Sequence, residues 1–328
     1  MPTQSFLFDT ETLQPENQPL NPHERFDGYT GGKCWQAHIS EVNLSADLKE
    51  AGLTESQASQ LRIEDFDFRY VDSANKEGCL EVKKFIKRHE WLGKMPTTPT
   101  HRFTARLKKK GTLAGVIVMS TPNTFSYLLG KENRDKEKLI SRGACISWSP
   151  KNTASWLIMQ SIKWMVNNTS FRYFTAYSDP EAKELGTIYQ ACNFIYLGQS
   201  FGSGYQYLDP NNPSRGWFGE AGFNDRSQIV RYAKALDIKW QPDWFKYVGT
   251  NKTFKKVNWA NIPTEIADRL KQERTEHKAR CEQRPSPSKH KYCYILGRDK
   301  RETKHYKQLF KDNNPDKIDL AYPSVRGS

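Results

Sequence analysis

A carboxylate and a phenol stand ten residues apart in the stretch Ala176–Ser200, and both side chains suit acid–base chemistry. Asp179 follows an alternating aromatic segment and precedes Pro180, which lacks an N–H and favours an open turn. Its carboxylate can therefore project into a cleft. Tyr189 shares a predicted helical face with apolar residues. We expect both to converge on one cleft; the alternatives are an Asx turn or helix cap at Asp179 and a core ring at Tyr189.

A second polar stretch, Ser149–Ser155, lies at the start of a predicted helix. It offers an N-cap, a proline suited to the first turn, and free backbone N–H groups. Such a helix N-terminus binds phosphate, although simple capping explains the same residues. We predict that a phosphate-bearing cofactor contacts Ile146, Ser147, Trp148, Lys151, Asn152, Thr153 and Ala154.

A further set of side chains has spacing that resembles metal ligands: His277, Cys281, His290 and Cys293. The spacing matches no standard zinc finger, crosses a Pro-rich break, and puts Cys293 inside a predicted strand. We therefore predict no metal site there.

The charge of the chain points to a polyanionic partner. Its 328 residues carry a formal net charge of +13, with a pI near 9.3. A generally basic, solvated surface is the alternative. Clustering favours nucleic acid, because Lys108, Lys109 and Lys110 share one turn and basic residues recur over 298–307.

Other features exclude several classes of protein. No apolar run approaches the 18 or so residues that cross a bilayer, and the first residues lack the pattern of a secretory signal. Six scattered cysteines do not form a disulfide framework. We expect a cytoplasmic protein with no membrane partner.

The periodicities predict a mixed α/β sheet. Aromatic and charged residues alternate over 66–70, which indicates a strand. The apolar residues of Leu80–Gly93 have near-helical spacing. A hairpin, a strand, a helix, a strand, a helix and a strand then follow over 101–123, 139–148, 150–168, 171–180, 185–194 and 194–201. The fold class is α/β with helices on both faces of the sheet.

Five parts are expected along the chain. Residues 1–60 form an N-terminal extension, and 61–208 form the core. Residues 209–284 interrupt the alternation of predicted strands and helices and form a partly helical, basic insertion. The last core strand and a basic helix occupy 285–311, and 312–328 form a tail.

This order of elements resembles the GCN5-related N-acetyltransferase (GNAT) fold, and more closely the phage Mom-like DNA modification proteins. The resemblance rests on FIKRHEWLG, ISRGACISWSPKNTAS, YSDPEAKELGTIYQACNFIYLGQS and KHKYCYILGRDKRET, and covers roughly 60–208 and 285–311. One departure is the phosphate loop: acetyltransferases carry glycines there, whereas this chain has none between Gly143 and Gly186.

The resemblance implies an enzyme that modifies the exocyclic amine of adenine in phage DNA, adding a methylcarbamoyl group and blocking host restriction. It would act in the cytoplasm of the infected or host bacterial cell. It implies a catalytic role for Asp179, Tyr189 and Ser155, with acetyl-CoA or a related acyl donor as cofactor. It also implies that His89 and Trp91, at the end of the first helix, contact the acceptor. The alternative for His89 is a favourable interaction with the helix dipole.

The implied DNA substrate needs phosphate contacts. We predict that it is held by Lys108, Lys109, Lys110, Arg298, Lys300, Arg301, Lys304 and Lys307. Two other functions stay open: an acyltransferase acting on tRNA, a hypermodified base or a protein amine, and a non-catalytic DNA-binding module. The binding module would have no need of Asp179 and Tyr189.

Overall fold

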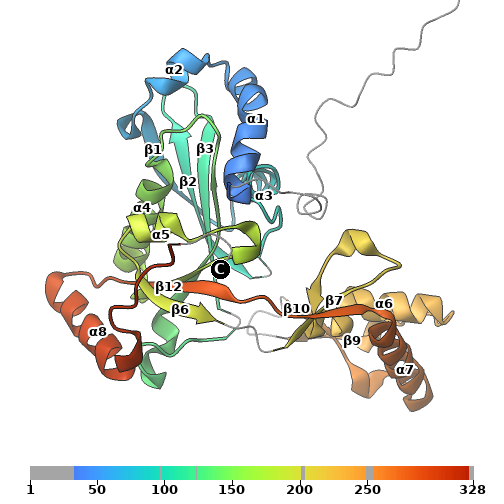
Figure 1. Cartoon of the computed structure of the whole chain (residues 1–328). Coiled ribbons are helices and arrows are strands. Elements are labelled where there is room, and N and C mark those ends of the chain that lie inside the picture. Colours follow the sequence, from blue (N-terminus) through green and yellow to red (C-terminus); the bar gives the residue numbers. More distant parts are fainter. Residues whose placement is uncertain (1–32, 97, 123, 201–203, 249–253, 325–328) are drawn as a thin grey trace, which may run out of the picture.

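The computed structural model describes residues 33–96, 98–122, 124–200, 204–248 and 254–324, and its centre is a seven-stranded sheet (Figure 1). The strand order is β1-β2-β3-β4-β5-β12-β6. Only β4 and β5 run parallel, and the other neighbours are antiparallel. The strands are Phe66–Val71, Pro99–Leu107, Leu113–Ser120, Glu137–Cys145, Tyr173–Ser178, Lys289–Ile295 and Ile195–Ser200, for β1, β2, β3, β4, β5, β12 and β6. The predicted mixed α/β fold is confirmed.

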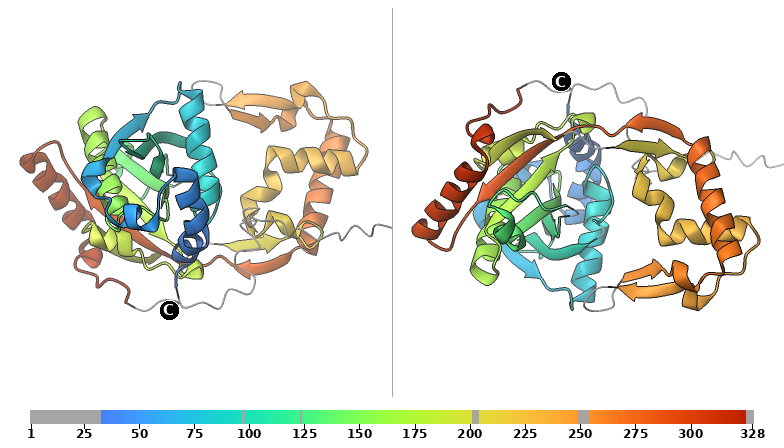
Figure 2. Two further views of the ribbon diagram at one scale, coloured as in Figure 1. Left: turned by 90° about the horizontal axis from the view of Figure 1, so that it is seen from above. Right: turned by 90° about the horizontal axis from the view of Figure 1, so that it is seen from below.

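Helices cover both faces of this sheet, because its central strands are apolar on both sides (Figure 2). Every residue of β3 is buried. Helix α3 (Lys76–His89) packs against β2, β3 and β4 on one face, and α4 (Thr153–Asn168) packs against the same strands on the other. Leu157, Ile162 and Met165 of α4 are fully buried.

The described part of the region before β1 contains two α-helices. Helix α1 (Trp35–Ala51) ends at Gly52, whose φ of 59° lies in the left-handed region. A short helix α2 (Glu55–Ser59) restarts at Thr54, which forms a capping box with Gln57. Leu48 and Ala51 join the same hydrophobic cluster as residues of α3, so α1 packs on the core.

The last strand enters the sheet between β5 and β6, and the C-terminal helix α8 (Lys300–Asn313) packs beside it. Tyr306 and Phe310 of α8 share a cluster with Cys293 and Ile295 of β12. The polar side of α8 remains exposed.

Residues between β6 and β12 form a second lobe beside the core (Figure 1). A three-stranded sheet, β11-β7-β8, lies with the helices α6 (Arg226–Ala235) and α7 (Thr264–Arg280) and the hairpin β9–β10. The strands are Tyr205–Leu208, Phe218–Gly219, Phe245–Val248, Phe254–Val257 and Glu282–Pro285, for β7, β8, β9, β10 and β11. The lobe has its own core, which includes Ile229, Tyr232 and Leu270.

Short 3₁₀ helices connect these elements: Ile63–Asp65, Lys131–Lys136, Pro180–Ala182 (η3), Pro213–Arg215, Glu220–Asn224, Pro242–Trp244, Trp259–Asn261 and Pro315–Lys317. Among the residues that the structure describes, no helix has the length and apolar character needed to cross a membrane.

Candidate active site

A cavity of about 920 Å³ opens where the two parallel strands part. β4 and β5 pair from Glu137 with Tyr173 to Ile140 with Ala176. Beyond that point β4 pairs only with β3, and the end of β5 pairs with β12. A register shift opposite Val118 and Met119 marks a bulge in β4 at the parting. The gap between the strand ends is thus an opening in the sheet itself, and it is large enough for a small-molecule ligand.

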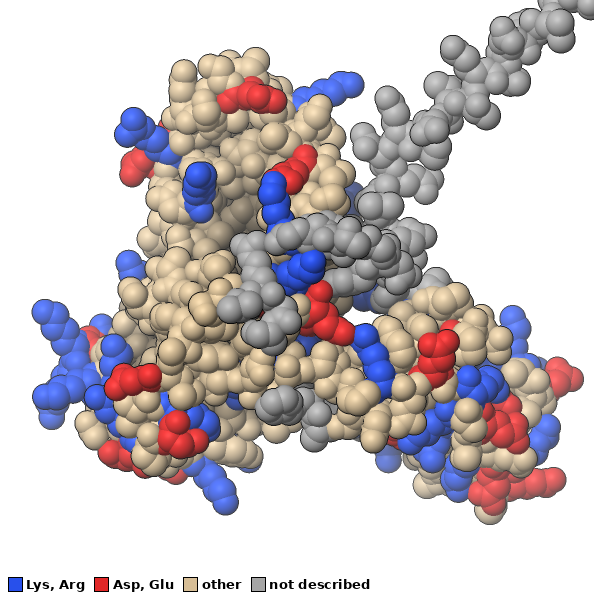
Figure 3. Space-filling view, viewed as in Figure 1, with Lys and Arg blue, Asp and Glu red and all other residues tan. Residues whose placement is uncertain are grey.

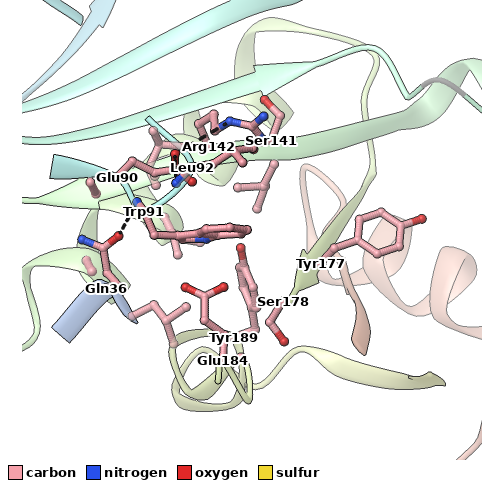
Figure 4. A pocket seen from close by; sticks show the side chains of 18 of the residues that line it. Gln36, Glu90, Trp91, Leu92, Ser141, Arg142, Tyr177, Ser178, Glu184 and Tyr189 are labelled. Atoms are coloured by element: carbon pink, nitrogen blue, oxygen red, sulfur yellow. Dashed lines mark hydrogen bonds and ion pairs between the residues drawn. The ribbon is translucent and has the colours of Figure 1, made fainter. Parts of the chain in front are cut away.

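The connection from α3 to β2 closes the cavity on one side and carries Trp91 into it (Figure 4). Gln36, at the start of α1, holds this connection at two points. Its Oε1 accepts a hydrogen bond from the Trp91 N–H at 3.1 Å, and its Nε2 donates to the His89 carbonyl. The half-buried indole is therefore positioned through its backbone, and its ring faces the cavity.

Opposite Trp91 lie Glu184, from the loop after η3, and Tyr189, from helix α5 (Thr187–Ala191). The three side chains point toward one another (Figure 4). Gly186 permits the tight entry into α5, because its φ is 64° and a Cβ there would meet the Tyr292 ring at 2.5 Å. The helix is shorter than the expected 185–194, and Leu185 lies outside it.

Burial shifts the pKa values of Glu184 and Tyr189. It raises the pKa of Glu184 to about 8, and the neighbouring Glu90 carboxylate adds to the effect. Burial also raises the pKa of Tyr189, and the charges of Glu184 and Glu90 act in the same direction. Tyr189 therefore keeps its proton at neutral pH, whereas Glu184 can exchange one close to it.

Asp179 lines the same cavity but is engaged on both oxygens. Its Oδ1 accepts a hydrogen bond from the Glu181 N–H at 3.0 Å and caps η3. Its Oδ2 lies 3.2 Å from Nζ of Lys289, at the start of β12. The turn and cap that the sequence left open as an alternative are present, and the strand end and α5 nevertheless meet at one cavity.

Some of the residues predicted to bind the cofactor line the cavity, and others do not. Ile146, Ser147, Lys151 and Ala154 line the cavity. Trp148 does not, because its ring is 4% exposed and stacks on Phe66 within the core. Thr153 is fully buried in the first turn of α4.

Asn152 and Ser155 line a separate, shallower hollow that also holds Cys192 and Tyr294. The hydroxyl of Ser155 donates a hydrogen bond to the Asn152 carbonyl at 3.0 Å. The structure thus brings Tyr189 together with Asp179 but places Ser155 outside their cavity. Helical geometry is the reason, because Ala154 and Ser155 are adjacent in sequence and project about 100° apart around the axis.

His89 also lies outside the cavity. It is 5% exposed, its ring centroid lies 4.3 Å from that of Phe85, and its Nδ1 lies 3.7 Å from Asp47. Burial lowers its pKa to about 4, and the adjacent Arg88 charge contributes. The ring is therefore neutral and structural here, and Trp91 is the residue of this pair that reaches the site.

A buried carboxylate ties α1 to α3 and to the loop after β4. The Asp47 side chain is fully buried, receives Arg88 Nη2 at 2.6 Å, and accepts a hydrogen bond from Ser147 Oγ at 2.7 Å. Arg88 → Met leaves this carboxylate without its cation. We expect the free energy of unfolding to fall by about 2–4 kcal/mol, less than for a wholly buried pair because Arg88 is partly exposed.

Urea denaturation measures this loss. The matched control is Arg62 → Met, since Arg62 is exposed and contributes only its backbone to a cap. That control should change stability by no more than about 0.5 kcal/mol. Equal losses in the two variants would show that the Asp47–Arg88 pair is not a brace.

The predicted DNA-contact residues form two groups that lie far apart (Figure 1). Lys108 Nζ donates to the Glu64 carbonyl at 2.6 Å, and Lys110 Nζ donates to the carbonyls of Ala51 and Gly52 at 2.8 Å each. These two ammonium groups fasten the β2–β3 turn to its neighbours, and Lys109 is exposed. The second group is exposed at and just before α8 and consists of Arg298, Lys300, Arg301, Lys304 and Lys307. Figure 3 shows basic side chains gathered in this part of the molecule.

Two residues that line the cavity, Glu184 and Gln36, were not predicted from the sequence. Glu184 stands midway between Asp179 and Tyr189, yet in a stretch with three other charged residues nothing distinguishes it as the one turned inward. Gln36 belongs to α1, far from the site in sequence. Neither carries a local pattern, because both depend on which elements meet.

Comparison with known families places these residues in context. Residues 78–212 match the Mom protein family. This Mom-family segment comprises 135 of the 328 residues, and it contains Trp91, Asp179, Glu184 and Tyr189. The predicted resemblance to Mom-like proteins is confirmed over this part of the chain. No curated protein matches the sequence significantly.

Several solved structures align with the chain at low similarity. The ribosomal-protein-S5-alanine acetyltransferase of Vibrio fischeri is 13% identical, with a TM-score of 0.31, over 43% of this chain and 85% of its own. yncA of Salmonella typhimurium, solved with its cofactor acetyl-CoA, is 10% identical with a TM-score of 0.31, over 42% and 83%. Malonyl-CoA decarboxylase of Rhodopseudomonas palustris is 12% identical with a TM-score of 0.32, over 89% and 69%. These scores are too low to support inferences about ligand or activity.

Proposed function

We propose that the chain is a transferase that modifies the exocyclic amine of adenine in DNA. One observation carries the proposal: the cavity at the parting of β4 and β5, within the Mom-family segment, presents an indole, a carboxyl group and a phenol to one another. A pure binding module has no need of two perturbed acid–base groups in its cleft.

The amine of adenine is delocalised into the ring and is a poor nucleophile, so it benefits from a positioned base. Glu184 is the candidate that we favour for this role, because its pKa near 8 suits proton exchange close to neutral pH. Asp179, held by Lys289 and the Glu181 N–H, serves as an orienting group. The Trp91 indole supplies a surface on which a base can stack.

The other reactant is an acyl donor, which supplies an activated carbonyl carbon when bound. The cavity residues fit a donor of the coenzyme A type: Lys151, which is exposed, and Ala154 lie at the positive end of α4, where a phosphate is stabilised. The chain's own residues would manage the protons. Glu184 would take the proton that the amine loses as the new C–N bond forms, and Tyr189 would donate a proton to the leaving group as its bond to carbon breaks.

Mass spectrometry of nucleosides tests the reaction. Cells that express the chain should contain deoxyadenosine of increased mass, and their DNA should resist some restriction enzymes. Unmodified DNA alongside modified tRNA or protein amines would favour the second acyltransferase hypothesis. No modification at all, with folded protein confirmed, would favour the non-catalytic DNA-binding module.

An amine within a base pair cannot reach this cavity, so the adenine must flip out at a cost of a few kcal/mol. Phosphate contacts offset that cost, and the exposed basic face of α8 is our candidate for supplying them. Replacing Arg298, Arg301 and Lys304 by alanine should weaken binding to all DNA sequences alike. The slope of log affinity against log salt should flatten by roughly 2–3 units.

Filter-binding titrations over a salt series measure this slope. The control triple is Lys83, Lys84 and Lys87 to alanine, which removes the same charge from exposed positions on α3. An unchanged slope in the α8 triple, or an equal change in both, would remove α8 as the specific phosphate-binding surface.

A further inference from the structure

The second lobe brings three side chains of different ligand chemistry to one point: Asp209, His277 and Cys281. One ligand atom of each lies within 4.8 Å of the other two. Asp209 is 9% exposed and His277 is 1% exposed. The group lies outside the active-site cavity and, apart from Asp209, outside the Mom-family segment.

Secondary structure explains why these residues meet. His277 and Cys281 are four residues apart at the end of α7, so they lie one turn apart on one face. Cys281 directly precedes β11, and Asp209 directly follows β7. Because Glu282 pairs with Leu208 in this antiparallel ribbon, the register carries Asp209 next to Cys281.

The histidine is held as metal-ligating histidines usually are. Its Nδ1 lies 2.6 Å from the hydroxyl of Tyr232, and its Nε2 faces Asp209 Oδ2 at 3.0 Å. A partner on Nδ1 fixes the ring and leaves Nε2 to act as the ligand. The rings of Phe218, Phe223 and Tyr232 surround the imidazole at 5.1–6.3 Å and limit access of water.

The ligand set selects the kind of ion. One thiolate, one imidazole and one carboxylate suit a zinc-type cation, whereas calcium and magnesium prefer oxygen alone. Two of the ligands are anionic and balance the two positive charges. Arg215 and Arg280 lie near the site, and their own charges are offset by Asp225 at 3.7 Å and Glu273 at 3.2 Å.

We propose that Asp209, His277 and Cys281 bind one Zn²⁺ or a similar divalent cation, with a water molecule as fourth ligand. The ion would join the β7–β11 ribbon to α7 and so brace a small lobe. A hydrogen-bonded brace alone would use Asp209, His277 and Tyr232 and would not need Cys281. The sequence pattern did not reveal this site, because it grouped His277 and Cys281 with His290 and Cys293. Those last two residues lie in β12 of the core sheet, outside the lobe.

Metal content of the untagged full-length protein tests the proposal. After incubation with Zn²⁺ and removal of the excess, we expect close to one zinc per chain, and at least a tenfold lower content in Cys281 → Ala. The control is Cys79 → Ala, which removes a half-buried thiol on α3. Co²⁺ provides a second probe: thiolate-to-cobalt absorption should appear in the wild type and the control and be absent in Cys281 → Ala.

The zinc content and cobalt spectrum of the wild-type protein test the proposal even if a variant fails to fold. Absence of stoichiometric zinc and of the thiolate-to-cobalt band in the wild-type protein would overturn the proposal. Equal zinc and the same band in folded Cys281 → Ala or His277 → Gln would overturn it too. Tyr232 → Phe should weaken zinc affinity about tenfold or more while retaining the cobalt band, because it removes only the partner that orients His277.

Discussion

Replacing Tyr189 with phenylalanine should lower the initial rate of adenine modification by about 10²–10⁴-fold. The hydroxyl is the only group lost, and its raised pKa keeps it protonated and able to donate at neutral pH. The ring keeps its contacts with Phe194 and Tyr292, both at 5.3 Å between centroids, so folding should be preserved. The rate is the early accumulation of modified deoxyadenosine after induction, at equal protein levels.

The control for this loss is Tyr247 → Phe. Tyr247 is 57% exposed and lies in the second lobe, so loss of its hydroxyl should leave the rate unchanged. More than half of the wild-type rate in Tyr189 → Phe would exclude the phenol as the proton donor. Circular dichroism and thermal melting confirm that a slow variant is folded.

Glu184 → Gln should lower the rate by a similar factor, about 10²–10⁴-fold, and remove its dependence on pH near 8. A base acts when ionised. Because the pKa of Glu184 is raised to about 8, the wild-type rate should rise as the pH increases through that value. The measurement is the initial rate across a pH series that brackets 8, in a lysate that supplies the donor.

Glu184 → Gln should also change how the free energy of unfolding depends on pH. Between the unperturbed pKa of 4.5 and the folded value near 8, the folded chain retains a proton that the unfolded chain releases. Stability therefore falls as the pH rises through this window, and Glu184 → Gln removes that fall. The variant should gain stability relative to the wild type as the pH increases.

Glu181 → Gln is the matched control, because Glu181 is three residues away, exposed, and paired with Arg284 at 2.9 Å. It should keep both the rate and its pH dependence. A wild-type rate that falls as the pH rises through 8 would mean that the protonated carboxyl is the active form, and Glu184 would then be no base.

Local patterns were enough to predict the sheet and part of the cavity. Alternation and apolar runs indicated the strands, since side chains on a strand alternate between faces and β3 is buried on both. Asp179 was predicted at a strand end, and the structure places it beside the cavity with Trp91 and Tyr189. Three of the four stretches that carry the Mom resemblance lie within the matched residues 78–212.

Tertiary packing decided the rest. Helical spacing could not tell that Ala154 faces the cavity while Ser155 faces a separate hollow, or that His89 belongs to the core. Burial in the assembled cavity raises the pKa of Glu184, and the charge of Glu90, 94 residues earlier, adds to the effect. Asp209 meets His277 and Cys281 only through the register of β7 with β11. The physical reason is common to all: a sequence pattern defines the faces of one element, but burial, charge and ligand sets depend on the distant element that covers that face.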